Sequence, residues 1–68
     1  MKTVSGLQFA KALERKGWKL DRVNGSHHIY KALGGFATVS VPIHGNKDLR
    51  VGTLRALLRD SGLTEADL

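Results

Sequence analysis

Cysteine is absent from this chain of 68 residues, which excludes a disulfide framework and a zinc site built on thiolates. Long apolar runs are absent as well. No stretch approaches the roughly 20 apolar residues that a membrane-spanning helix needs, and the start of the chain has no signal-like segment. We therefore expect a soluble protein of the cytoplasm with no membrane partner.

Acidic residues are also few, and the charge of the chain is strongly positive. Eleven Lys and Arg against six Asp and Glu give a formal net charge of +5. On so small a surface, such a field attracts nucleic acid or an acidic protein partner, although solubility alone would also account for it. So few residues bury only about 60% of the unfolded surface, and we expect one small domain, residues 1–68.

Residues 6–16 carry the signals of a helix at both ends. Ser5 and Gln8 have the spacing of a capping box. Gly17 is placed as a left-handed stop, after which Trp18 can fold back onto the helix. The pattern predicts a first helix over Gly6–Lys16.

Residues 51–61 show a second helix that ends in the same way, with Gly62 as its stop. Its apolar residues recur at helical spacing and predict a buried stripe: Val51, Leu54, Leu57 and Leu58. Residues 64–67 can begin one more turn.

Three short strands are expected between the helices, at residues 19–23, 27–31 and 37–41. Asn24-Gly25 is a strong turn dipeptide that predicts a hairpin, and Pro42 ends the pairing because it has no N–H. The order α-β-β-β-α predicts an α+β domain with a three-stranded antiparallel sheet and two helices on one face. This is the layout of a double-stranded-RNA-binding-like fold.

Two adjacent imidazoles, His27 and His28, follow the predicted turn and must face opposite sides of their strand. We expect Ile29 in the core, with His27 on its face. His28 is then the more exposed imidazole, beside Ser26 and Tyr30. Because histidine titrates near neutral pH, His28 is a candidate general base. A structural role for both histidines is the alternative.

RNA suits such a base because its 2′-OH is a built-in nucleophile, and general base catalysis contributes about 10² to 10⁴ in rate. The scattered acids do not form the carboxylate cluster of a two-metal nuclease, so we expect cleavage without a metal or other cofactor. A metal site made of the three histidines alone is the alternative. The general acid is left open among four candidates: His44, Lys31, Lys47 and Tyr30.

Other basic residues lie near the second helix. Lys47 and Arg50 precede its start, where free N–H groups favour phosphate, and Arg55 lies on its outer face. A solvated helix face is the alternative. Trp18 and Phe36 are expected in the core rather than as platforms for stacking bases.

Five motifs follow one another along the chain: Gly17-Trp18, Gly25-Ser26-His27-His28, Val39-Ser40-Val41-Pro42-Ile43-His44, Gly52-Thr53-Leu54-Arg55 and Gly62. In that order they resemble the HicA family of small bacterial ribonuclease toxins. The resemblance implies a double-stranded-RNA-binding-like fold and cleavage of mRNA. The family's essential histidine, in the pattern Gly-Ser-x-His, matches His28. Ala32-Leu33 departs from the family, where relatives often carry a basic residue and proline.

The resemblance also implies two partners, the mRNA substrate and a HicB-like antitoxin, with DNA contacted only through the antitoxin. A non-catalytic double-stranded-RNA-binding module and a pure protein-interaction module are the alternatives. Besides the catalytic candidate His28, the residues expected to bind RNA or support the site are Gly25, Ser26, His27, Tyr30, Lys31, His44, Lys47, Arg50 and Arg55.

Overall fold

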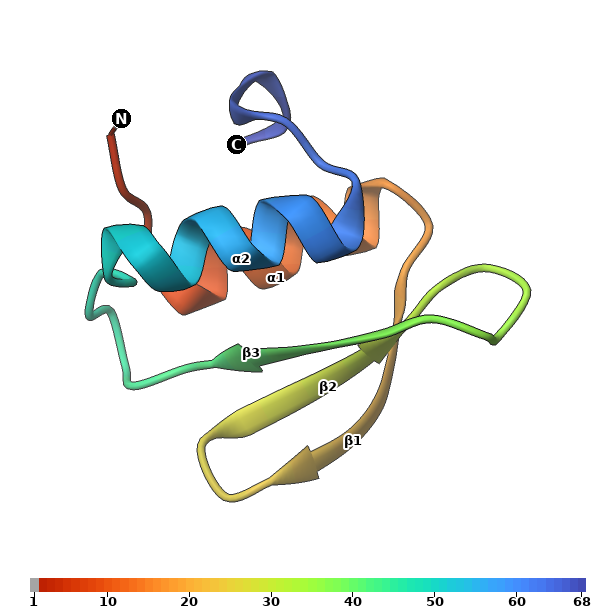
Figure 1. The fold of residues 1–68 in the computed structure, drawn as a ribbon. Helices are drawn as coiled ribbons and strands as arrows, with labels where there is room; N and C mark the ends of the chain where they lie inside the picture. The colour runs from red at the N-terminus through yellow and green to blue at the C-terminus, as the bar shows by residue number, and fades with distance from the viewer. Residues whose placement is uncertain (1) are drawn as a thin grey trace.

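Two helices cover one face of a three-stranded antiparallel sheet in the computed structural model, which describes residues 2–68 (Figure 1). The predicted α-β-β-β-α order and its one-sided layering are confirmed. Neither helix in this part of the chain is long and apolar enough to cross a membrane. The elements are α1 Gly6–Arg15, β1 Lys19–Asn24, β2 His27–Lys31, β3 Thr38–Pro42, α2 Val51–Ser61 and the 3-10 turn η1 Glu65–Asp67.

The ends of α1 form as the sequence predicts. The Ser5 hydroxyl accepts a hydrogen bond from the Gln8 N–H at 3.1 Å, and the Gln8 side chain accepts one from the Ser5 N–H at 2.9 Å. This is a complete capping box. At the other end Gly17 has a φ of 94°, and the Trp18 N–H donates to the Leu13 carbonyl at 3.0 Å. That bond closes the predicted Schellman motif.

Replacing Ser5 with alanine should lower the free energy of unfolding by about 1 kcal/mol, because the first turn of α1 loses its hydroxyl acceptor. For a domain of this size, the melting temperature should fall by roughly 4–8 °C. Thermal unfolding followed by circular dichroism measures the change. Gln8→Glu, which keeps an acceptor for the Ser5 N–H, should melt like the parent protein. A Ser5→Ala protein as stable as the parent would contradict the role of the cap.

The β1–β2 hairpin turns at Gly25 and Ser26, one residue later than the predicted Asn24-Gly25 turn. Asn24 pairs with His27, which extends β1 by one residue beyond the prediction. Gly25 adopts a φ of 62° at the first turn position, where a two-residue hairpin loop favours glycine. β3 is likewise displaced by one residue, to Thr38–Pro42.

A bulge in β1 decides which of its side chains share a face. Leu20 pairs with Tyr30 and Val23 pairs with His28, and the register shifts between Leu20 and Arg22. The extra residue brings Leu20 and Val23 to the same side of the sheet despite their odd spacing. That side is the helix side, because Tyr30 is buried in the core.

The helices leave β1 largely uncovered. They pack over β3, and the far end of the β1–β2 hairpin projects away from them (Figure 1). Leu20 and Val23 consequently remain 47% and 53% exposed, although they lie on the helix side. We call these two residues the uncovered strip.

The core lies between the helices and the sheet, and its four largest fully buried side chains are Phe9, Leu13, Val41 and Leu54. Besides Ile29, which is described below, two core predictions are wrong. Val51 is exposed because α2 begins beyond the end of β3, and Phe36 is exposed because the β2–β3 loop projects past the helices (Figure 1). Trp18 is half-buried and packs against the core.

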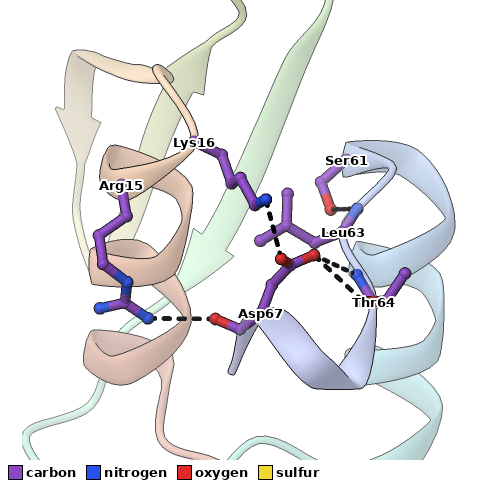
Figure 2. Close-up of polar contacts among 6 residues, drawn as sticks. All are labelled: Arg15, Lys16, Ser61, Leu63, Thr64 and Asp67. Carbon is purple, nitrogen blue, oxygen red and sulfur yellow. Dashed lines mark hydrogen bonds and ion pairs between the residues drawn. The ribbon is translucent and has the colours of Figure 1, made fainter.

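The predicted last turn is present as η1, which forms an ion pair and a hydrogen bond with the end of α1 (Figure 2). One oxygen of the Asp67 carboxylate lies 3.0 Å from Lys16 Nζ, and the other accepts the Thr64 N–H at 2.8 Å. Arg15 donates to the Asp67 carbonyl at 3.1 Å. The hydrogen bond from Thr64, followed by that from Lys16, lowers the pKa of Asp67.

The Asp67 contacts should make stability depend on pH. Because the pKa is lowered in the folded state, the stabilisation is present above the unfolded pKa of about 3.9 and is lost as pH falls through the lower folded pKa. Asp67→Asn keeps an acceptor for Thr64 but no charge. It should melt below the parent protein at pH 7 and together with it in strong acid. A melting difference that stays constant across pH would contradict the charged contact.

Candidate functional site

β2 carries the two histidines to opposite faces of the sheet, but their predicted exposure is wrong. Tyr30, not Ile29, is the buried residue of β2, with 4% of its surface exposed. His28 shares the helix side with Tyr30 and is half-buried, whereas His27 is exposed on the other face. The larger tyrosine ring occupies the core because its hydroxyl reaches Glu14 of α1, 3.4 Å away.

His28 occupies the middle of a row that crosses the sheet. Its neighbours in the register are Val23 on β1 and Val41 on β3. Val41 is fully buried, while Val23 belongs to the uncovered strip. The imidazole therefore lies at the boundary between the core and the solvent, where packing can orient it and a ligand can still reach it.

Tyr30 lies behind His28 on the same face of β2. Burial raises the pKa of Tyr30, and the charge and hydrogen-bonding oxygen of Glu14 raise it further. The phenol therefore remains protonated at neutral pH, and its hydroxyl donates a hydrogen bond to Glu14. This placement suits a supporting role, in which Tyr30 holds β2 against α1.

The face of the sheet away from the helices, the open face, is polar. His27 Nδ1 lies 3.2 Å from the Ser40 hydroxyl. Lys31, at the far end of β2, lies 3.8 Å from an Asp21 carboxylate oxygen, and Arg22 lies 2.6 Å from the other oxygen. The charges of this face are therefore partly neutralised within the face itself.

The Gly25-Ser26 turn is hydrogen-bonded to the segment that follows β3. The Ile43 N–H donates to the Ser26 carbonyl at 2.8 Å. The pairing thus continues one residue past Pro42, where the sequence predicts that it stops. This bond brings the next residue, His44, to the same end of the sheet as the histidine pair.

A hollow of about 240 Å³ lies between the end of β3 and the start of α2. Cationic side chains converge on it, and α2 begins without a side-chain hydrogen bond from its cap residue and without an acid in its first turn. Such a helix start is electropositive. The residues that line the hollow include Pro42, His44, Lys47, Asp48, Arg50 and Thr53.

The loop before α2 is held in place by the N-terminal segment. The Leu49 N–H donates to the Val4 carbonyl at 2.8 Å, and the Thr3 hydroxyl donates to the Leu49 carbonyl at 2.5 Å. Within the loop, the Lys47 N–H donates to the His44 carbonyl at 3.1 Å. Sequence reasoning missed these supports, because no local pattern links residues 3 and 49.

The remaining candidates lie farther from the hollow. Arg55 is exposed on α2, and Lys31 lies at the opposite end of β2 from the hairpin turn. Nothing lies within 4 Å of the space that a side chain at Gly52 would occupy, so no packing contact requires glycine there. Among residues 2–68, no three His, Asp or Glu side chains form a group that could hold a metal ion.

One comparison with known proteins gives a match. A family model described as HicA toxin of bacterial toxin-antitoxin matches residues 6–63, which leaves five residues unmatched at each end. The matched part contains both helices, all three strands and the hollow before α2. A comparison with curated proteins finds no match.

Proposed function

The chain belongs to the HicA toxin family of bacterial toxin–antitoxin systems, and from this premise we propose that it is an endoribonuclease that cleaves mRNA and so stops translation. His28 is the general base of the reaction. The cations around the hollow bind the RNA backbone, and a HicB-like antitoxin neutralises the toxin.

The position of His28 is the observation that supports this proposal most directly. The imidazole lies between the buried Val41 and the half-exposed Val23, on a strand that is hydrogen-bonded along both edges. A general base must be oriented and must also reach the proton that it removes. His27 contacts the Ser40 hydroxyl but does not border the core, because it lies exposed on the open face.

The proposed reaction needs only the RNA and side chains of the protein. Neutral His28 accepts the proton of a 2′-OH, and the 2′ oxygen attacks the neighbouring phosphorus. The bond from phosphorus to the 5′ oxygen breaks, and a general acid protonates the leaving oxygen. The products are a 2′,3′-cyclic phosphate and a 5′-OH end. Among the candidate acids, His44 and Lys47 line the hollow before α2.

The hollow before α2 supports the binding of phosphate. Lys47 and Arg50 bring positive charge to its walls beside His44 and Asp48, and the start of α2 adds N–H groups without a side-chain cap. Such donors stabilise the negative charge that develops on phosphorus oxygens in the transition state. The bond from Ile43 to Ser26 joins this hollow to the turn that leads into His28.

The antitoxin is expected to be acidic, because the toxin carries a net charge of +5 and opposite charge speeds association. The simplest way for it to block cleavage is to cover the uncovered strip and His28. A complex in which His28 stays open to solvent would contradict this mode of inhibition.

Induced expression in bacteria tests the proposed function. The parent protein should arrest growth and fragment mRNA, and co-expression of an acidic protein encoded beside its gene should relieve the arrest. The His28→Ala protein, made at the same level, should do neither. RNA that stays intact while the purified protein still binds it would identify a non-catalytic RNA-binding module instead.

A further inference from the structure

The β2–β3 loop presents two large apolar side chains to solvent. Phe36 is 101% exposed and Leu33 is 85% exposed. The loop lies at the end of the sheet opposite the β1–β2 turn (Figure 1). A fully exposed aromatic ring has no packing role within the chain, and a concentration of apolar surface at one place marks a binding site.

The loop has a defined shape that holds these side chains outward. The Ala32 N–H donates to the Ala37 carbonyl and the Gly35 N–H donates to the Ala32 carbonyl, both at 2.9 Å. Gly34 and Gly35 have φ values of 101° and 85°, a conformation that other residues adopt only with strain. Because the loop already has this shape, binding a ligand there costs little conformational entropy.

Positive charge surrounds the base of the loop. Lys31 ends β2 immediately before the loop and pairs across the sheet with Lys19 on β1. Both lysines are exposed. Asp21 lies 3.8 Å from Lys31 and also pairs with Arg22, so this one acid offsets only part of the positive charge.

Exposed apolar surface on the helix side of β1 runs from the row of His28 towards this end of the sheet. Val23 lies beside His28 in one row, and Leu20 lies beside Tyr30 in the next row towards the loop. The uncovered strip thus leads along β1 from the catalytic candidate towards the loop, and Lys19 and Lys31 lie on the open face at that end of the sheet.

We infer that Phe36 is a stacking platform for one base of single-stranded RNA, at a subsite remote from His28, with Lys19 and Lys31 holding the neighbouring phosphates. This inference rests on the proposed function, because the same RNA would occupy both places. Binding sites for single strands combine cations that follow the backbone with aromatic rings on which bases stack.

Charge favours RNA over a protein as the occupant of this loop. A protein anchored by Leu33 and Phe36 would need to place acidic groups opposite both lysines, whereas every RNA segment carries phosphates beside its bases. Aromatic stacking also accepts any base, which suits an enzyme that meets many different mRNAs.

Equilibrium binding of a labelled single-stranded RNA of about 12 nucleotides, measured by fluorescence anisotropy, tests the inference. All variants carry His28→Ala, so that the probe stays intact. Adding Phe36→Ala should weaken binding by about 5- to 100-fold. Phe36→Tyr should restore it, and Phe36→Leu should not. Leu33→Ala, in the same loop, is the matched control and should change the affinity less than twofold.

The outcomes separate the two proposals. A His28→Ala protein that binds no RNA overturns the proposed RNA-binding function together with the subsite. Binding that Phe36→Ala leaves unchanged overturns the subsite alone. Full binding by Phe36→Leu, or an equal loss from Leu33→Ala, overturns the stacking platform, because an apolar contact without stacking would then account for the binding. Because Phe36 is fully exposed, its variants should melt like the parent protein.

Discussion

Replacing His28 with alanine should lower the rate of RNA cleavage by about 10²- to 10⁴-fold, the usual contribution of a positioned general base. The loss should appear in the rate under single-turnover conditions, while the affinity for RNA changes little. Quantification of cleaved and intact RNA after rapid mixing gives this rate. His28→Gln, which keeps the bulk of the side chain between Val23 and Val41, should be as inactive as His28→Ala.

The neighbouring histidine provides the matched control. His27 lies on the open face and contacts Ser40, so His27→Ala should cleave RNA within a few-fold of the parent rate. Thermal melting of each variant separates catalytic loss from unfolding. Equal losses of activity in His27→Ala and His28→Ala, with both proteins folded, would contradict the assignment of the base.

Replacing Gly6 with alanine should destabilise the fold more than any other change considered, by about 3 kcal/mol. A Cβ atom at this position would overlap with the Pro42 carbonyl oxygen and lie 3.2 Å from Cγ1 of Ile43. The first residue of α1 therefore packs directly on the end of β3, and backbone atoms cannot move aside cheaply. The melting temperature should fall by roughly 12–24 °C.

The other helical glycine gives the opposite expectation. Gly52 lies in the first turn of α2 with nothing within 4 Å of the added methyl group. Gly52→Ala should stabilise the protein by about 0.4–1 kcal/mol, chiefly by restricting the unfolded chain. Thermal melts of the two variants under identical conditions check both expectations. A Gly6→Ala protein as stable as Gly52→Ala would contradict the close packing of α1 on β3.

The ends of the helices could be predicted because they depend on residues that are close in sequence. The Ser5–Gln8 capping box and the Gly17 stop each involve a few adjacent residues, and both formed as expected. The antiparallel hairpins followed from glycine-containing turns in the same way. Such local rules fixed the order of the elements and, with it, the fold class.

The faces of β2 could not be predicted in this way. Alternation shows that His27 and His28 point to opposite sides, but not which side faces the helices. That choice depended on Tyr30, whose hydroxyl meets Glu14 from α1. Apolar character alone wrongly favoured Ile29 for the core. The bulge in β1, which adds Val23 to the row of His28, likewise had no sequence signal.

Only part of the hollow before α2 could be predicted from the sequence. Lys47 and Arg50 were expected near a helix start from their position in the sequence. Their convergence with His44 depends on bonds between Leu49 and the N-terminal residues Thr3 and Val4, which no local pattern reveals. The prediction for Phe36 was wrong, because this aromatic residue was expected in the core and lies fully exposed on a loop.

Cleavage of a defined mRNA by the purified protein in excess EDTA, followed from about pH 5 to pH 8, tests the central claim most directly. The parent protein should cut without a divalent metal and leave cyclic phosphate and 5′-OH ends. Its rate should rise with pH, because only a neutral imidazole can accept the proton of the 2′-OH. The His28→Ala protein should show no such rise. Cleavage that EDTA abolishes, or a pH profile that His28→Ala leaves unchanged, would contradict an imidazole base at this position.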